Sequence, residues 1–438
     1  MVNNMKILLI NANKDYSTTF SSKLLYKLNS NPILVLQQVA ASIPNGHQIR
    51  IINDRYESPF VKEKYDLVGI SSVTPSAPRA YQIADEYRKR GIPVVLGGIH
   101  PSSMPEEAKQ HADAVVIGEA EYSFPKLIND LNNGGLKPFY YPEPRVDPAK
   151  IPEPRRDLVK IQPLFSGVAP SRGCPYNCAF CTLTHLHGNI YRARPIEQVI
   201  QEIKNTPRKF IVFLHDASLT INPDYTKALL KAMKPLKRKF IAYGSAPVLA
   251  RDDELLKLSA EAGCVLWCVG LESICQDSLK DAGKGYKVQS YELLAKKIHK
   301  QGMSLFTSYV FGFDHDTPDI FDRTLQFAHD INADAAEFNV LTPFPITRLF
   351  KQLDKERRIL TYDWEKYDLH HVVFQPKNMT PEELYNGVAS VSSRFYSIKH
   401  VLKRIGNVTF KTRKYPNFLV ITAINTIMAR FHLEMSPI

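Results

Sequence analysis

Short apolar runs alternate with amphipathic stretches along most of this 438-residue chain, and no other feature constrains its fold as strongly. In the first part, strand candidates lie at 6–12, 49–54, 67–72, 94–98 and 114–118, with helical patterns at 32–43, 77–90 and 121–131. Later strand candidates lie at 165–171, 210–216, 240–246, 265–272, 305–313 and 336–342, again separated by helical patterns. Such alternation is typical of parallel sheets covered by helices. We therefore predict an α/β protein with two parallel-sheet units.

Proline content marks the boundary between the two units. The chain has 30 prolines, and many of them fall between residues 138 and 163, where they favour extended backbone. We predict a Rossmann-like domain at 1–140, a proline-rich linker at 141–164, a partial (β/α)6 barrel at 165–345 and a helical region at 346–438. In the last region, strand signal is limited to 370–374. There, Val391, Phe395, Ile398, Leu402 and Ile405 recur at the spacing of one amphipathic helix.

The strand ends of the first unit carry residues suited to ligand binding. Parallel sheets bind ligands at the carboxyl ends of their strands. Here those ends carry Ser71-Ser72, Gly97-Gly98 and Gly118-Glu119. Glycine lets the backbone approach a ligand closely, although a tight turn explains a Gly-Gly pair equally well.

Three cysteines follow the first strand of the second unit. Cys174, Cys178 and Cys181 have the spacing C-x3-C-x2-C, which places three thiolates on one short loop. A closed structural metal site needs four ligands, so three thiolates leave one metal position open for a substrate or cofactor. The other cysteines are Cys264, Cys268 and Cys275. We expect Cys264 and Cys268 to share one face of a strand as packing residues rather than to bind a second cluster.

The cysteine spacing, with Phe180 before the last cysteine, resembles the signature of the radical S-adenosylmethionine (SAM) family. The resemblance implies a [4Fe–4S] cluster on the three cysteines, whose open iron binds SAM and whose electron releases a 5′-deoxyadenosyl radical. It also implies that Phe180 lies near the adenine. Asp216 after the second barrel strand, and Glu272 and Ser273 after the fourth, match positions that contact SAM in that family.

The first unit resembles the domain of cobalamin-binding radical SAM proteins, in a subgroup that includes the hopanoid methylase. A methylthiotransferase is nearly excluded, because no cysteine precedes Cys174. The D-x-H-x-x-G motif that supplies a histidine to cobalt elsewhere is absent, Ala120 replaces a glycine, and Pro345-Ile346-Thr347 replaces P-G-T. The cobalamin contacts implied by the resemblance are Ser71, Ser72, Thr74, Gly97, Gly98, His100, Gly118 and Glu119. His100 fits a ligand contact and a strand-end histidine equally well.

Three functions are compatible with these residues. The first is a cobalamin-dependent methyltransferase that methylates an unactivated carbon of a small-molecule or lipid-like substrate. The second is the same radical chemistry used for ring formation, rearrangement or oxidation, without methyl transfer. The third is a non-catalytic cobalamin or iron–sulfur sensor, which would not need Asp216 and Glu272 placed for SAM. The family implies a low-potential electron donor of the flavodoxin or ferredoxin type.

Charge is concentrated at the end of the chain. The formal net charge is +12, and residues 391–438 hold eight Lys or Arg against one acidic residue. This basic region, with the apolar stretch 417–429, is expected to pack on the barrel, with peripheral membrane contact as the alternative. Nucleic acid is not expected, because no recognisable binding motif is present. No signal peptide or spanning segment is evident, so we expect a cytoplasmic protein, with a peripheral position at the inner membrane face as the alternative.

Overall fold

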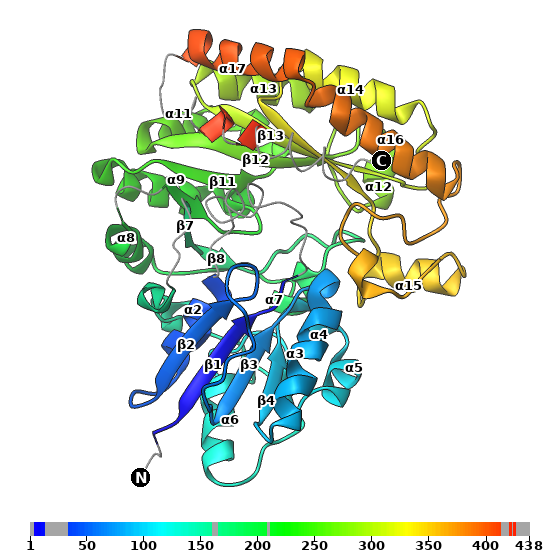
Figure 1. Cartoon of the computed structure of the whole chain (residues 1–438). Helices are drawn as coiled ribbons and strands as arrows, with labels where there is room; N and C mark the ends of the chain where they lie inside the picture. The colour runs from blue at the N-terminus through cyan, green and yellow to red at the C-terminus, as the bar shows by residue number, and fades with distance from the viewer. Residues whose placement is uncertain are drawn as a thin grey trace.

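The computed structural model describes residues 4–13, 34–159, 165–207, 211–412, 420–422 and 424–425 (Figure 1). Two six-stranded parallel sheets form its two halves, as the alternation of strands and helices predicts. The start of the predicted helix at 32–43, part of the linker and most of the apolar stretch 417–429 lie outside the described residues.

The first sheet has the strand order β2-β1-β3-β4-β5-β6, and every pairing is parallel. Its strands are β1 (Lys6–Asn11), β2 (Gln48–Asn53), β3 (Leu67–Ser71), β4 (Val94–Gly97), β5 (Ala114–Val116) and β6 (Phe139–Tyr140). The strand order changes direction between β1 and β3, which is where doubly wound sheets bind ligands. Strand β6 was not predicted, because its two residues run directly into the proline-rich stretch.

Helices cover both faces of this sheet, and two apolar clusters form its core. The helices are α2 (Leu34–Ser42), α3 (Ala77–Lys89), α4 (Ile99–Ser103), α5 (Pro105–Gln110) and α6 (Ser123–Asn132), with a 3-10 turn η1 (Thr74–Ser76). Two further 3-10 turns, η2 (Pro148–Lys150) and η3 (Arg156–Leu158), follow in the linker.

The second sheet has the sequential order β7-β10-β11-β12-β13-β14. Its strands are β7 (Phe165–Val168), β10 (Ile211–Leu214), β11 (Phe240–Gly244), β12 (Cys264–Glu272), β13 (Ser304–Phe311) and β14 (Ala335–Val340). The outer helices are α8 (Ile196–Asn205), α9 (Pro223–Met233), α10 (Ala246–Arg251), α11 (Asp253–Ala262), α12 (Gln276–Asp281), α13 (Ser290–Lys300) and α14 (Ile320–Asp330), with 3-10 turns η4 (Leu219–Ile221) and η5 (Lys234–Leu236). Because β7 and β14 are the two edges, the sheet is a partial barrel, as predicted.

A small insertion separates β7 from the rest of the barrel. It contains β8 (Ser171–Arg172), α7 (Leu183–His187) and β9 (Arg192–Ala193), and β8 pairs with β9 in antiparallel fashion. The three-cysteine loop runs between β8 and α7. In Figure 1, α7 lies between the two halves of the molecule.

The C-terminal region is helical, but the single amphipathic helix expected from its apolar spacing is wrong. The chain forms α15 (Arg348–Lys355), η6 (Trp364–Lys366), α16 (Pro381–Phe395) and α17 (Ile398–Thr412). A break between α16 and α17 arises because the Tyr396 hydroxyl bonds to the Ala336 carbonyl and amide. Ile398 and Leu402 are consequently exposed, at 80% and 64%. The strand signal at 370–374 yields only a bridge between Ile359 and Phe374.

The expectation that Cys264 and Cys268 share one strand face is also wrong. Cys264 packs in the core beneath the outer helices, whereas Cys268 faces the barrel interior. The register between β11 and β12 shifts, so that Phe240 pairs with Cys264 but Ile241 pairs with Leu266. This extra residue turns the rest of β12 over. Both cysteines are buried, as expected of packing residues.

The described end of the chain closes the bottom of the barrel. Val420 and Ile421 are buried among inward-facing residues of the barrel strands. Asn425 donates to the Asp334 carbonyl and accepts from Arg404, whose guanidinium lies 3.9 Å from the Phe395 ring centroid. Within the described residues, no helix is long and apolar enough to cross a membrane.

This packing predicts a measurable stability difference between two C-terminal positions. Ile421→Ala should lower the free energy of unfolding by about 2–4 kcal/mol, because a fully buried side chain leaves a cavity. Leu402→Ala, at an exposed position of α17, should cost less than about 0.5 kcal/mol. Urea unfolding of both variants measures the difference, and equal effects would refute the packing.

Candidate functional site

The three-cysteine loop is fixed at its base and its middle. Gly173 has a φ of +79°, and a Cβ there would lie 2.1 Å from the Ile190 carbonyl oxygen. In the middle of the loop, the Ala179 amide donates to the Ala282 carbonyl at 3.0 Å, and the Leu349 amide donates to the Ala179 carbonyl at 2.9 Å. The loop is therefore held by the residue that follows α12 and by the first turn of α15.

The three thiols influence one another electrostatically. Burial raises the pKa of Cys174, Cys178 and Cys181, and the charges of neighbouring thiolates raise it further. The ammonium of Lys284 opposes this effect at all three thiols. Within the described residues, no three Cys, His, Asp or Glu side chains are already gathered in metal-ligand geometry. The donor set nevertheless fits an iron–sulfur cluster, because soft thiolates on one loop share a compensating cation.

Lys284 is itself held by Glu272. Its Nζ lies 2.8 Å from Glu272 Oε1, and although burial lowers the pKa of Lys284, Glu272 raises it overall. Glu272 has a φ of +63°, a conformation that costs a residue with a Cβ about 1–2 kcal/mol. A side chain at Gly270 would displace the Glu272 carboxylate from Lys284, because a Cβ there would lie 2.4 Å from Glu272 Oε1. The predicted SAM contact Glu272 is thus strained, paired and close to Cys178.

The other predicted SAM contacts surround the same loop. Asp216 is buried, accepts hydrogen bonds from the Ser171 hydroxyl and the Ser218 amide, and is near enough to raise the pKa of Cys174. Burial raises the pKa of Asp216 itself. The ring of Phe180 lies 6.3 Å, centroid to centroid, from that of Phe313.

Ser273 follows Glu272 and accepts from the Cys275 amide at 3.0 Å. The fold therefore gathers Phe180, Asp216, Glu272 and Ser273 around the cysteines.

Most predicted cobalamin contacts form one close-packed edge of the first sheet. A Cβ on Gly98 would lie 2.7 Å from the Ser72 carbonyl oxygen and 2.8 Å from Ser71 Oγ, so only glycine fits there. Buried Ser72 Oγ has no hydrogen-bond partner among the described residues. Thr74 is buried at the start of η1. Gly97 is the last residue of β4 and immediately precedes Gly98. A glycine cradle with an unpartnered hydroxyl fits a bound cofactor at the carboxyl edge.

His100 belongs to a contact that the sequence did not reveal. It is fully buried, its Nε2 lies 3.3 Å from Glu107, and its ring meets that of Trp364 at 5.4 Å. Glu107 also accepts from Trp364 and Tyr81, and these bonds lower its pKa against the effect of burial. The C-terminal η6 is therefore packed against the cofactor edge. The Trp364 contact spans 257 positions, so sequence spacing offers no signal for it.

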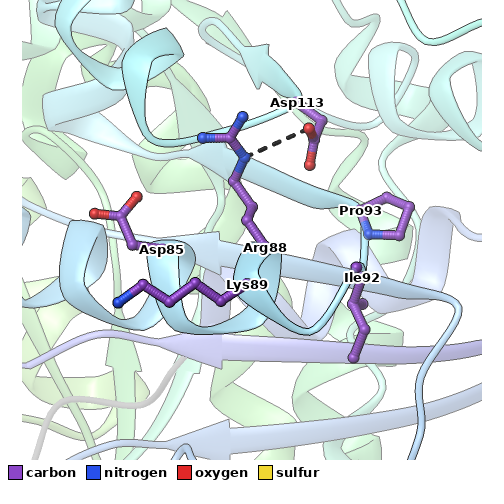
Figure 2. Close-up of a pocket in the computed structure, with 7 residues that line it drawn as sticks. Asp85, Arg88, Lys89, Ile92, Pro93 and Asp113 are labelled. Carbon is purple, nitrogen blue, oxygen red and sulfur yellow. Dashed lines mark ion pairs between the residues drawn. The ribbon is translucent and has the colours of Figure 1, made fainter.

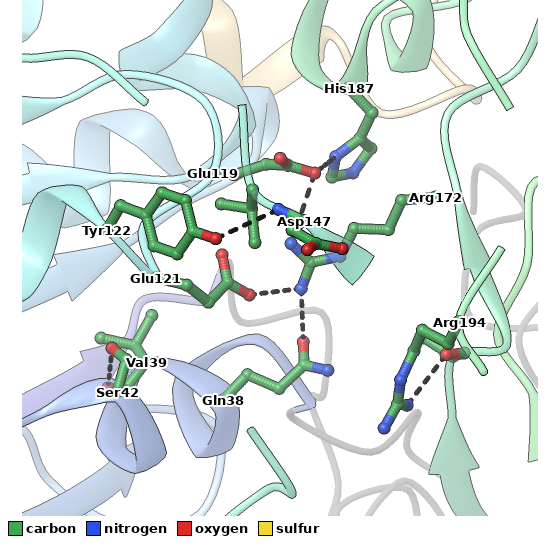
Figure 3. A network of polar contacts seen from close by, with 12 residues as sticks. Gln38, Val39, Ser42, Glu119, Glu121, Tyr122, Asp147, Arg172, His187 and Arg194 are labelled. Atoms are coloured by element: carbon green, nitrogen blue, oxygen red, sulfur yellow. Dashed lines mark hydrogen bonds and ion pairs between the residues drawn. The ribbon is translucent and has the colours of Figure 1, made fainter. Parts of the chain in front are cut away.

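Glu119 joins the two halves of the molecule. It pairs with His187 at 3.1 Å, Arg192 at 2.7 Å and Arg172 at 3.3 Å. Against the effect of burial, these partners lower its pKa from 4.5 to about 2. Its stabilising effect is therefore complete above pH 4.5 and is lost as pH falls through about 2. Figure 3 shows Arg172 reaching Glu121 and Gln38 of the first half.

Gly118, the remaining predicted cobalamin contact, also lies at this junction. It has a φ of +75°, and a Cβ there would lie 3.6 Å from the Leu186 carbonyl of α7. Its amide donates to Ser102 Oγ at 2.9 Å. The structure thus places Gly118 and Glu119 after β5, next to the Gly98 edge and at the contact between the two halves.

A surface pocket lies at the opposite edge of the first sheet (Figure 2). Asp85, Arg88 and Lys89 at the end of α3 line it, with Asp113 3.5 Å from Arg88. It adjoins the start of β4, whereas the glycine pair adjoins its end. The pocket is therefore not part of the cofactor site.

Family comparisons agree with this architecture. Residues 168–328 match the radical SAM superfamily, and residues 34–128 match the B12 binding domain. Bacteriochlorophyllide d C-12(1)-methyltransferase of Chlorobaculum tepidum is 30% identical over 85% of this chain and 82% of its own length. The chain belongs to the radical SAM superfamily, in the group with a B12-binding domain. It is an enzyme whose cofactors are a [4Fe–4S] cluster, SAM and cobalamin, as predicted.

Further relatives refine the picture. Bacteriochlorophyllide d C-8(2)-methyltransferase of the same organism is 29% identical over 92% of this chain and 93% of that protein. The hopanoid C-2 methylase of Rhodopseudomonas palustris, a type of relative inferred from sequence, is 24% identical over 74% of this chain and 64% of its own length. The fold is shared with the methyltransferase TsrM of Kitasatospora setae, with a TM-score of 0.69 at 15% identity, over 98% of this chain and 99% of that one.

The junction between the halves can be tested through Arg172. Arg172→Ala should lower the free energy of unfolding by about 3–5 kcal/mol, because it leaves the buried Glu121 carboxylate without its cation. The control is Arg155→Ala, which breaks an exposed pair with Asp157 and should cost about 1 kcal/mol at most. Denaturant unfolding measures both variants. Similar small losses would show that the network does not hold the halves together.

Proposed function

We propose that this protein is a cobalamin-dependent radical SAM methyltransferase that methylates an unactivated carbon of a small-molecule or lipid-like substrate. The observation that supports it best is the meeting of a three-thiol loop with SAM-type residues beside the B12-binding half. Two relatives that share most of the chain are named methyltransferases.

We assign the cofactors to the predicted residues. Cys174, Cys178 and Cys181 hold the cluster. The SAM contacts are Phe180, Asp216, Glu272 and Ser273. The cobalamin contacts are Ser71, Ser72, Thr74, Gly97, Gly98, His100, Gly118 and Glu119. When bound, these groups supply a carbon-centred radical and a transferable methyl group.

The chain's own residues hold and shield that chemistry. Burial raises the pKa of the three thiols, and the charge of Lys284 counteracts this rise and so favours the thiolates that bind iron. Glu272 keeps Lys284 in place. The Glu119 network fixes the cysteine loop against the first half. We divide the chain into a cobalamin domain at 1–140, a linker at 141–164, a barrel at 165–345 and a C-terminal region at 346–438.

One relative favours the second function. The anaerobic magnesium-protoporphyrin IX monomethyl ester cyclase of Rubrivivax gelatinosus is 26% identical over 83% of this chain and 71% of its own length. Its name describes ring formation rather than methylation. Radical chemistry without methyl transfer is therefore the alternative, and the activity assay described below must distinguish it from methyl transfer.

For the C-terminal region we propose packing on the barrel, supported by the burial of Val420 and Ile421. The alternative, peripheral contact with an anionic membrane, rests on the exposed Ile398 and Leu402 beside the exposed Lys399 on α17. Sedimentation with anionic vesicles at low salt distinguishes the two, since only the alternative gives binding that Ile398→Ser abolishes.

The cluster assignment predicts different effects for two cysteine variants. Cys178→Ala should abolish both the iron–sulfur absorbance and the cleavage of SAM to 5′-deoxyadenosine, because two thiolates cannot retain the site-differentiated cluster. Cys275→Ala, which removes a cysteine outside the loop, should retain both. Cluster content and 5′-deoxyadenosine are measured after anaerobic reconstitution. Full SAM cleavage by Cys178→Ala would refute the assignment.

The methyl-transfer step is tested by two products of one reaction. Anaerobic turnover with SAM, cobalamin, a low-potential reductant and cell extract should yield 5′-deoxyadenosine and S-adenosylhomocysteine, both dependent on cobalamin. Methylation needs one SAM for the radical and another for the methyl group. If only 5′-deoxyadenosine accumulates, the proposal of methyl transfer is wrong, and radical chemistry without methyl transfer, such as ring formation, replaces it.

A further inference from the structure

The interior of the partial barrel consists of two layers of different character. The lower layer is apolar, and its members are Phe165, Ile211, Phe213, Ile241, Val265, Leu266, Cys268, Phe306, Val420, Ile421 and Ile424. The last three come from the C-terminal segment and close this layer from below. The lower layer therefore offers no polar group to a ligand.

The upper layer follows from the alternation of side chains along a strand. Residues two positions apart point to the same side, so His215 follows Phe213 and Tyr243 follows Ile241 on the inner face. The rings agree with this placement: Phe213 lies 4.3 Å from His215 and 5.4 Å from Tyr243. In contrast to the lower layer, these inner positions are polar.

Two strands complete the upper layer. Ser308 of β13 pairs in register with Glu337 of β14, and Asn339 follows Glu337 at the same spacing. Asn339 Nδ2 donates towards Ser308 Oγ at 3.4 Å. The intervening Phe338 points the other way, into the core beneath the outer helices.

The groups of this layer surround a common space. The charge of Glu337 raises the pKa of Tyr243, although Tyr243 lies on the distant β11. Tyr243 retains 41% of its surface accessible, yet burial is the main cause of its raised pKa. Because the Tyr243 ring also lies 5.4 Å from the Phe213 ring on the inner face of the sheet, this accessible surface lies on the inner side of the barrel.

The acceptors in this layer are incompletely satisfied. Among the described residues, the Asn339 side chain hydrogen-bonds to Glu337 and lowers its pKa against the larger effect of burial, but no cation pairs with Glu337. Asn339 is only 4% exposed, and its Oδ1 has no hydrogen-bond partner in the described part of the chain. The same holds for His215 Nε2. A carboxyl group without a cation and a buried amide oxygen without a donor would both be stabilised by a donor from outside the chain.

The layer also lies next to the proposed SAM contacts. Glu272, at the end of β12, is close enough to raise the pKa of Glu337. A ligand held by Glu337 would thus sit inside the barrel beneath Glu272.

We propose that His215, Tyr243, Glu337 and Asn339 form a substrate subsite that binds a hydrogen-bond-donating group, an amine, N–H or hydroxyl, with Glu337 as its anchor. This rests on the proposed function, because it assumes that a substrate enters the barrel. This subsite narrows the substrate class, because a molecule that presents only hydrocarbon here would leave Glu337 without a cation and Asn339 Oδ1 without a donor. The lipid-like substrates that remain are those with a polar group at the reacting end.

Small probes test the subsite without knowledge of the substrate. Ligand-observed NMR would compare benzylamine, benzyl alcohol and benzoate binding to the reconstituted full-length protein with SAM. Wild type should bind benzylamine and benzyl alcohol in preference to benzoate. Glu337→Gln should weaken benzylamine about tenfold, as expected for loss of one charge-assisted hydrogen bond. Glu292→Gln, an acid on the outer helix α13, should have no effect.

Several outcomes overturn the subsite. These are equal benzylamine binding by wild type and Glu337→Gln, a preference for benzoate, or an equal loss of SAM affinity, which would assign Glu337 to the cofactor. If Glu337→Gln does not fold, the isosteric Tyr243→Phe replaces it, and a threefold or greater weakening of benzyl alcohol is expected.

A turnover measurement separates this inference from the proposed function. In cell extract with isotopically methyl-labelled SAM, Glu337→Gln should form about tenfold less labelled product per 5′-deoxyadenosine than wild type. Absence of labelled product in wild type would refute methyl transfer alone. An unchanged ratio in the variant would refute the subsite alone.

Discussion

One buried carboxylate positions the two halves of this enzyme. Glu119 lies at the carboxyl edge of the first sheet, and its partner Arg172 stands two residues before the first cysteine of the loop. An arginine desolvated between two carboxylates tolerates little displacement, since either carboxylate left alone in the interior would be costly. The cysteine loop therefore cannot move far from the B12-binding edge. The carboxyl edges of the two parallel sheets are thus held in a fixed position relative to each other, with the cysteine loop beside the B12-binding half.

A second charge balance operates inside the cysteine loop. Three thiolates and the nearby Asp216 and Glu272 concentrate negative charge, and Lys284 is the cation common to the three thiols. Glu272 adopts a left-handed backbone to reach Lys284. A similar strain occurs at Ile346, with a φ of +71°, where the family usually has glycine. Backbone strain of this kind persists where surrounding structure enforces it, and both positions lie at carboxyl ends of barrel strands.

Local pattern made the two sheets and the cysteine loop predictable from sequence. Buried parallel strands are continuous apolar runs, and the helix predicted at 77–90 is observed as α3 (Ala77–Lys89) because its apolar face repeats regularly. Features that depend on distant contacts were not predictable. The bulge that separates Cys264 from Cys268 arises from pairing with β11, and the break after α16 arises from Tyr396 contacting β14. Likewise, Glu119 appeared as a strand-end ligand residue because nothing near it in sequence indicates Arg172 or Arg192.

The C-terminal segment helps to make the lower layer of the barrel interior apolar, whereas the layer above it is polar. An open six-stranded barrel leaves its lower end to water unless another element fills it, and Val420 and Ile421 do so. Because this apolar layer excludes water from below, each polar group above it loses solvent as a hydrogen-bond partner and must find another partner within the barrel. Ser308 satisfies the Asn339 amide nitrogen but not its oxygen, and no residue in the described part of the chain neutralises Glu337. A chain that needed only stability would fill these positions with apolar side chains, as it does one layer below. The retention of a carboxyl group without a cation and an amide oxygen without a donor, near the proposed SAM contact Glu272, is the structural reason to look for a substrate that brings its own donor.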